Sequence, residues 1–178
     1  MIKLQGKDIY LAALEREHVK ILWQNEEYDF NNPTQPLKIG YSNESASEYY
    51  EDIQKRRKDD SFVQLGIFLN DGTVIGDVGL QDIDGISRCC TIGIGICKIK
   101  DRNCGYGKQA MELIIEHGFN QIGLERIAAD TWENNISAQK ALEKLGFVLE
   151  GRGRKAVYFG GKRYDMMMYG LLAEEWKK

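Results

Sequence analysis

The heptapeptide Arg102-Asn103-Cys104-Gly105-Tyr106-Gly107-Lys108 lies between an apolar stretch, residues 91–97, and an amphipathic stretch, residues 109–119. This order predicts a strand, a glycine-containing turn and a helix. The first amides of a helix have no partner within it, and the helix dipole attracts negative charge to that end. Gly105 and Gly107 let the backbone approach a ligand closely, and Lys108 adds a positive charge. The stretch therefore predicts a phosphate-binding turn, although glycines at this spacing also occur in ordinary tight turns.

Two known phosphate-binding motifs are alternatives to this interpretation. The sequence contains no G-x-x-x-x-G-K-[ST], which argues against a P-loop nucleotidase. A dinucleotide fingerprint is formally met by Gly105, Gly107 and Ala110, and Asp130 lies near the place of its ribose-binding acid. A dinucleotide-dependent enzyme therefore stays open at this point.

Length and composition predict one domain over residues 1–178 with a full-sized core. The net charge of −3 gives no sign of a nucleic-acid-binding surface. No apolar run has the roughly 18 residues of a membrane span, and no signal peptide is evident, so we expect no membrane partner and a cytoplasmic location. The four cysteines contain no C-x-x-C pair, and only two histidines are present, so we expect reduced structural thiols and no metal site.

The hydrophobic periodicity predicts an α/β (α+β) domain with a mixed, mostly antiparallel sheet of about seven strands and four flanking helices. Ser45-x-x-Glu48 resembles a capping box and predicts a helix start near Ala46. Asn70-Asp71-Gly72 and Gly160-Gly161 predict hairpin turns, with a long loop over residues 25–41. We expect strands over residues 7–13, 62–69, 74–83, 89–97, 126–131, 147–159 and 164–171, and helices over 14–24, 46–58, 108–119 and 135–145.

The strand over residues 89–97 has an unusual second face. Its even positions carry Cys90 and three isoleucines, whereas Gly93 and Gly95 share the opposite face. Two glycines on one face of a strand predict either a bulge or the close approach of a ligand or a packed helix.

Three motifs together resemble the GNAT family of N-acetyltransferases. Arg102-x-x-Gly105-x-Gly107 matches the family's [QR]-x-x-G-x-[GA] coenzyme A loop. The stretches 134–138 to 143–147 and 150–152 to 161–165 resemble the RimJ/RimL-like branch, which acetylates ribosomal proteins, and the spermidine acetyltransferases. The resemblance implies a GNAT acyl-CoA N-acyltransferase fold, with a sheet splayed between its fourth and fifth strands and acetyl-CoA in the gap.

The resemblance also implies roles for individual residues. Asn135 stands where the family's helix-capping asparagine contacts the coenzyme, Ser137 is a possible contact to its thiol end, and both also suit plain N-terminal caps. Backbone groups of Ile94, Gly95 and Ile96 would pair with the pantetheine arm. The pyrophosphate would be held by the amides of Arg102, Asn103, Cys104, Gly105, Tyr106, Gly107 and Lys108.

The expected reaction is direct attack of an amine on the acetyl thioester, with a backbone amide of Ile96 or its neighbour stabilising the oxyanion. The sequence departs from its relatives at both expected catalytic positions. Leu142 replaces the tyrosine acid of the spermidine enzymes, and Thr91 replaces a glutamate that many relatives carry. The remaining candidates are Tyr164 and Glu150 as the predicted catalytic residues, followed by Asp165, Glu26 and Glu27.

The resemblance leaves the acceptor open among a peptide N-terminus, a polyamine and another small-molecule amine. It also implies a possible homodimer. Because both expected side chains are missing, a non-catalytic acyl-CoA-binding sensor on the same fold stays an alternative.

Overall fold

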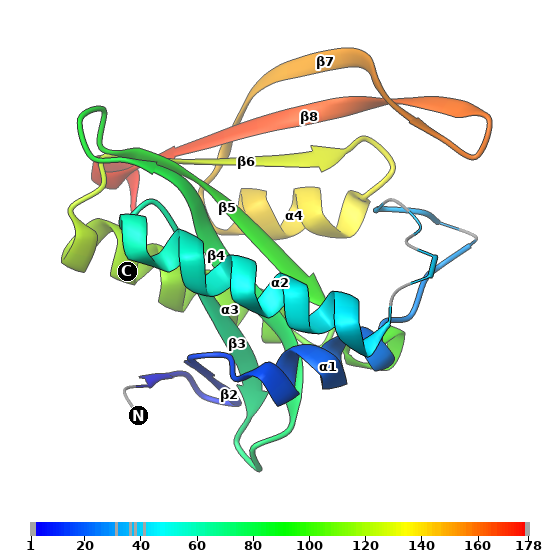
Figure 1. Ribbon diagram of the computed structural model, residues 1–178. Coiled ribbons are helices and arrows are strands. Elements are labelled where there is room, and N and C mark those ends of the chain that lie inside the picture. The colour runs from blue at the N-terminus through cyan, green and yellow to red at the C-terminus, as the bar shows by residue number, and fades with distance from the viewer. Residues whose placement is uncertain (1–2, 31, 36, 38, 41, 177–178) are drawn as a thin grey trace.

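The computed structural model describes residues 3–30, 32–35, 37, 39–40 and 42–176 (Figure 1). They form one eight-stranded sheet in the order β1-β2-β3-β4-β5-β6-β8-β7. The strands are β1 (Leu4–Gln5), β2 (Ile9–Ala12), β3 (Val63–Leu69), β4 (Val74–Asp84), β5 (Cys89–Ile96), β6 (Arg126–Trp132), β7 (Val148–Phe159) and β8 (Lys162–Leu172). The α-helices are α1 (Arg16–Gln24), α2 (Asn43–Arg56), α3 (Tyr106–His117) and α4 (Ile136–Lys144).

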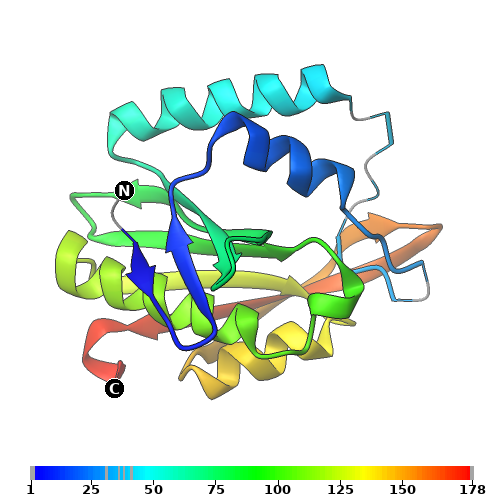
Figure 2. The ribbon, with the colours of Figure 1, turned by 90° about the horizontal axis from the view of Figure 1, so that it is seen from below.

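The sheet lies between two layers of helices. Figure 2 shows α1 and α2 on one side and α3 and α4 on the other. The larger core, on the α3 side, includes Ile67, Leu80 and Ile114, all fully buried. A second core, with Phe68 and Val19, lies under α1 and α2. No helix in the described ranges combines the length and apolar composition needed to cross a bilayer.

One junction in the sheet differs from all the others. β5 and β6 are parallel and pair only over Cys89–Thr91 and Arg126–Ala128, whereas every other neighbouring pair is antiparallel. Beyond these three pairs the two strands diverge, as Figure 1 shows. The splay lies between the fourth and fifth predicted strands, so this part of the expected fold is confirmed.

The sequence prediction needs correction at the N-terminal side. A two-residue strand, β1, precedes the predicted ones and brings the sheet to eight strands. The predicted capping box at Ser45 is wrong, because α2 begins three residues earlier: Ser42 is the N-cap, and its Oγ accepts the Ser45 amide at 3.2 Å. Residues 31, 36, 38 and 41 of the predicted loop lie outside the described residues.

Candidate active site

The turn between β5 and α3 presents a row of outward amides. Asn103 and Gly105 both have positive φ, 60° and 86°, and Gly105 is the N-cap of α3. Within the described chain, the amides of residues 103–108 meet no backbone acceptor outside the helix. A Cβ on Gly105 would meet nothing within 4 Å, and one on Gly107 would lie 3.6 Å from Ile94 Cδ1. Space, free donors and the positive end of the helix dipole make this turn suitable for an anion.

The side chains of the same turn mostly serve the protein itself. Lys108 Nζ pairs with Glu112 Oε1 at 2.8 Å, one helical turn further on. The Tyr106 ring packs against the larger core, and Cys104 is exposed, with its Sγ 3.5 Å from the Lys100 carbonyl oxygen. The turn therefore offers an anion chiefly its backbone, with the Lys108 charge close by.

Arg102 differs from its predicted role in phosphate binding. Its amide already donates to Ile99 O at 3.1 Å, so the backbone donor is occupied. Its guanidinium donates to the carbonyl oxygens of Ile96, Cys97 and Glu27 at 2.9, 2.9 and 2.7 Å. Arg102 therefore fastens the end of β5 to the segment after α1, and the residues that face the anion site begin at Asn103.

The unpaired edge of β5 faces the gap. The Cys97 amide donates to Ile75 O on β4, and backbone groups alternate sides along a strand, so those of Ile94 and Ile96 point toward the gap. Gly95 points the other way: a Cβ on Gly76 of β4 would lie 2.1 Å from Gly95 O. The structure thus corrects one detail of the prediction. Ile94 and Ile96 offer backbone groups to the gap, whereas the Gly95 carbonyl oxygen faces β4.

The start of α4 lies across the gap from this turn. Asn135 caps the helix, since its Oδ1 accepts the Ala138 amide at 3.2 Å. Ser137 Oγ donates to Asn103 Oδ1 at 2.7 Å. The cap interpretation of Asn135 is therefore confirmed, and Ser137 links α4 to the turn that carries the free amides.

Glu150 lies at the closed end of the gap. Its carboxylate accepts two hydrogen bonds from the Arg126 guanidinium, one of 2.6 Å, and Arg126 belongs to the paired part of β6. These hydrogen bonds lower the pKa of Glu150. A base that is ion-paired and held ionised binds a proton weakly, so this geometry favours a role in joining β6 to β7.

Tyr164 lies at the open end of the gap, among other aromatic residues. Its ring stacks on Trp132, with centroids 5.9 Å apart and planes 19° apart. Tyr28 reaches the same cluster through Phe159, at 5.9 Å. Burial, then the neighbouring Tyr164, raise the pKa of Tyr28, whose hydroxyl is buried and has no hydrogen-bond partner in the part of the chain described. Tyr164 is thus well placed beside the gap.

The segment after α1 spans the open end of the gap. On the β5 side the Glu27 amide donates to Cys97 O at 3.0 Å, and Glu27 Oε2 accepts the Ile99 amide at 2.7 Å. On the β6 side Asn134 Nδ2 donates to Pro33 O at 2.6 Å. Glu27 therefore fixes the segment after α1 to the end of β5, beside the site.

Asp165 has a structural position. Its Oδ1 accepts the Lys155 amide at 2.6 Å, and Oδ2 pairs with Arg152. These contacts lower its pKa, the Lys155 hydrogen bond most. Asp165 stabilises the irregular part of β7 and is held ionised there.

One polar group had escaped the sequence prediction. Gln64 on β3 donates through Nε2 to Asp77 Oδ2 on β4 and, at 3.0 Å, to the Tyr49 hydroxyl on α2. The sequence signal is Asp77, which interrupts the otherwise apolar and glycine-containing run of residues 74–80. These residues lie on the α1–α2 side of the sheet, beneath β5's glycines.

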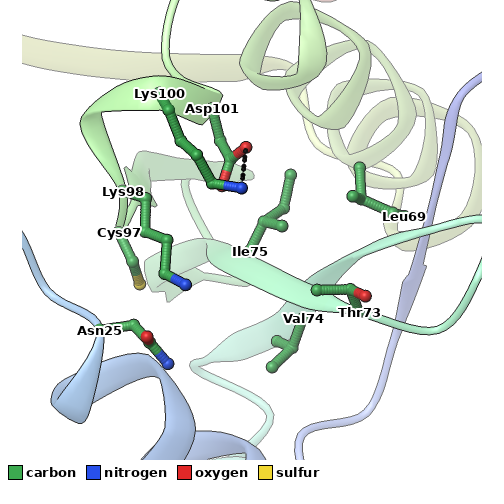
Figure 3. Close-up of a pocket in the computed structure, with 9 residues that line it drawn as sticks. All are labelled: Asn25, Leu69, Thr73, Val74, Ile75, Cys97, Lys98, Lys100 and Asp101. Atoms are coloured by element: carbon green, nitrogen blue, oxygen red, sulfur yellow. Dashed lines mark ion pairs between the residues drawn. The ribbon is translucent and has the colours of Figure 1, made fainter.

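Two recesses lie outside the gap. A cavity of about 60 Å³ lies beside the end of β5. Figure 3 shows its lining residues, among which Lys100 and Asp101 form an ion pair. A broad groove of about 630 Å³ is lined by Arg154, Lys155 and Asp165. The cavity has room for only a few water molecules and the groove is wide open, and neither is lined by a residue of the 103–108 turn.

Comparison with known proteins identifies the class of this fold and site. Residues 9–148 match the family model described as an acetyltransferase (GNAT) domain. The chain is 30% identical over 177 residues to YjcK of Bacillus subtilis, named a probable N-acetyltransferase, covering 95% of this chain and 96% of that protein. It is 29% identical over 137 residues to YdaF of the same organism, which carries the name of a ribosomal N-acetyltransferase, covering 75% and 74%.

Solved structures agree in fold. RimL, a ribosomal L7/L12 alpha-N-protein acetyltransferase in complex with coenzyme A, superposes with a TM-score of 0.86 at 17% identity, covering 96% of this chain and 98% of that one. A spermidine N-acetyltransferase from Vibrio cholerae, in complex with coenzyme A and spermine, gives 0.80 at 22%, with the same coverage.

The chain belongs to the GNAT acetyltransferase family. It is an N-acetyltransferase whose acetyl donor is acetyl-CoA. The dinucleotide alternative is therefore wrong, and the comparisons give no support to a non-catalytic sensor.

Proposed function

We propose that acetyl-CoA lies in the gap between β5 and β6 and that a primary amine attacks its acetyl carbon there. One observation carries the assignment: the unpaired edge of β5 leads directly into the free amides at the start of α3. The amides of residues 103–108 bind the pyrophosphate, while backbone groups of Ile94 and Ile96 pair with the pantetheine arm. Asn135 and Ser137 contact the arm from α4.

The chain's own groups then assist a simple transfer. The amine nitrogen forms a bond to the acetyl carbon, and the oxyanion that develops accepts a hydrogen bond from a gap-facing amide, Ile96 or its neighbour Ile94. The carbon–sulfur bond breaks, the nitrogen loses its proton, and coenzyme A leaves as a thiol. Tyr164 is the predicted acid that protonates the thiolate, because it lies at the open end of the gap. Positioning of the two substrates supplies much of the acceleration.

The acceptor we favour is the amino group at a peptide N-terminus. Relatives carry names for acetylation of ribosomal proteins, of L-amino acids and of spermidine. The polyamine option is weakened because Leu142, at the spermidine enzymes' tyrosine position, is only 4% exposed and belongs to the core. No helix of the described residues covers one face of the β6–β8–β7 half (Figure 1), which leaves room for a chain end.

Two measurements test this proposal in sequence. Calorimetric titration is expected to show binding of acetyl-CoA and none of NADH. Release of free thiol is then followed with a panel of amines: alanine- and serine-initiated peptides, amino acids, spermidine and an aminoglycoside. Turnover highest on the peptides supports the proposal. Binding of acetyl-CoA with no thiol release on any amine contradicts it, and a preference for spermidine contradicts the choice of acceptor.

A further inference from the structure

A carboxylate lies in a partly buried polar group next to the proposed site. Asp77 is near the middle of β4, on the face covered by α1 and α2, and its Oδ2 accepts a hydrogen bond from Gln64. Gln64 in turn contacts the Tyr49 hydroxyl. Burial, followed by the negative charge of Asp77, raises the pKa of Tyr49. Tyr49 and Gln64 thus orient the carboxylate and stay uncharged themselves.

The two glycines of β5 open this group toward the gap. Asp77 pairs in register with Gly95, and Gly79 pairs with Gly93. A Cβ on Gly95 would lie 3.4 Å from Asp77 Oδ1, and one on Gly93 would lie 3.2 Å from Gln81 Nε2. A larger residue at position 95 would therefore place its side chain against the Asp77 carboxylate. The glycines therefore leave this polar group uncovered by β5 side chains, next to the β5 segment whose Ile94 and Ile96 amides face the gap.

Charged side chains on the surrounding elements change the pKa values of groups around Asp77. On α2, Arg56 lowers the pKa of Tyr49, whereas Asp52 raises it. Burial raises the pKa of Cys97 at the end of β5. The charges of Glu26 and Asp77 raise it further, whereas Arg102 lowers it. Arg102 is held by three carbonyl oxygens, and among the described residues Asp77 is the carboxylate that a Cβ on Gly95 would meet.

We infer that Asp77 receives the amino group of the acceptor and takes the proton that this group must lose before it attacks acetyl-CoA. The inference rests on the proposed function, because it places the acceptor on the α1–α2 side of the donor. A protonated alkylamine binds over Gly95, and its N–H proton passes to Asp77, directly or through one water. The neutral amine then forms the carbon–nitrogen bond, and the carbon–sulfur bond breaks.

The chemistry defines the class of acceptor. A partly buried carboxylate attracts an ammonium ion more strongly than it would in water, and it has no comparable attraction for a hydroxyl or a weakly basic arylamine. Thr91 lacks a carboxylate on β5, and Asp77 supplies one on the neighbouring strand.

The test compares two isosteric substitutions on one strand. Asp77→Asn removes the carboxylate, and Asp82→Asn removes an exposed carboxylate from the same strand with the same change of charge. With the best amine of the panel, Asp77→Asn is expected to lower kcat/KM for the amine at least ~100-fold, and the Kd for acetyl-CoA is expected to change by less than about twofold. Asp82→Asn is expected to match the wild type in both.

A pH profile separates proton transfer from a structural effect. As pH rises toward the pKa of the amine, more of the amine is already neutral, so the deficit of Asp77→Asn is expected to narrow. A deficit that is the same at every pH, or a kcat/KM within about twofold of Asp82→Asn, overturns the inference.

Gly95→Ala provides a second variant if Asp77→Asn does not fold. It keeps the carboxylate and β5 backbone but places a methyl group against Asp77 Oδ1, so amine kcat/KM should fall at least ~10-fold with acetyl-CoA binding retained. Unchanged amine kinetics overturn the inference alone. If the wild-type protein does not bind acetyl-CoA, or shows no turnover with any amine, the proposed function is overturned and the inference with it.

Discussion

The two halves of the sheet are covered differently. In the first half, β2–β5, both faces are packed: Ile67 is buried against the α3 side and Phe68, the next residue, against the α1–α2 side. In the second half, β6–β8–β7, Leu171 is buried on the α4 side, whereas Met168 and Val148 are 39% and 53% exposed. The donor site lies where the fully packed half ends, and the open face of the other half is left for recognition of the acceptor.

Substitutions in the second half should show this asymmetry most strongly. Leu171 is fully buried, so Leu171→Ala is expected to lower the free energy of unfolding by about 2–5 kcal/mol through lost burial and a cavity. Val148→Ala, at a half-exposed position, should cost less than about 1 kcal/mol. Urea denaturation of both variants measures the difference. Similar losses for the two would show that the second half is packed on both faces.

A charge in the donor turn should have the next largest effect. Gly107→Glu places a carboxylate at the start of α3, beside Ile94 and the free amides, where it repels the pyrophosphate and reverses the benefit of the helix dipole. We expect acetyl-CoA affinity to fall ~100-fold, about 2.7 kcal/mol. Gly85→Glu, in an open turn between β4 and β5, adds the same charge and should leave the affinity unchanged. Equal calorimetric affinities for the two variants would remove the pyrophosphate assignment.

The donor turn was predictable because its signals are local. A run of isoleucines and glycines, two turn glycines and an amphipathic stretch specify strand, turn and helix without knowledge of the rest of the fold. The start of α2 was not, because Ser42 and Ser45 are both good N-caps and the entry direction of the chain decides between them. β1 was missed because two residues carry no periodicity.

The side-chain roles were predictable only in part, for a different reason. Glu150 finds its partner in Arg126, which the order β6-β8-β7 brings close from 24 residues away, and no sequence pattern encodes that order. Arg102 was linked to phosphate by its motif, yet three carbonyl oxygens compete for its guanidinium. A cap role for Asn135 was predictable, beside the coenzyme contact, because capping depends on its immediate neighbours.

Two helix caps sharpen the comparison of the donor and acceptor sides. Asn135 caps α4 and Ser42 caps α2, each accepting an amide at 3.2 Å. Replacing either with alanine is expected to cost about 1 kcal/mol of unfolding free energy. If Asn135 also contacts the coenzyme, only Asn135→Ala should weaken acetyl-CoA binding as well. Thermal denaturation with calorimetry separates the effects, and equal coenzyme affinity in the two variants leaves Asn135 as a cap alone.

The smallest expected effect is that of low pH on two aspartates, Asp71 in the first half of the sheet and Asp165 in the second. Hydrogen bonds from Thr73 lower the pKa of Asp71, in the β3–β4 turn, below 3.8, and those from Lys155 and Arg152 lower that of Asp165 in the second half. A carboxylate whose pKa is lowered by folding stabilises the folded state above its unfolded pKa, and this contribution is lost as pH falls through the folded value. The loss should therefore occur below pH 3.8 for both.

Lys155 has a φ of 52°, so protonation of Asp165 should release a strained bulge, whereas protonation of Asp71 affects only a tight turn. Amide NMR shifts over an acid titration should show changes that spread along β7 in the first case and stay within the turn in the second. Asp165→Asn should reproduce the β7 changes at neutral pH; if it leaves β7 unperturbed, the open half of the sheet holds its shape without this carboxylate.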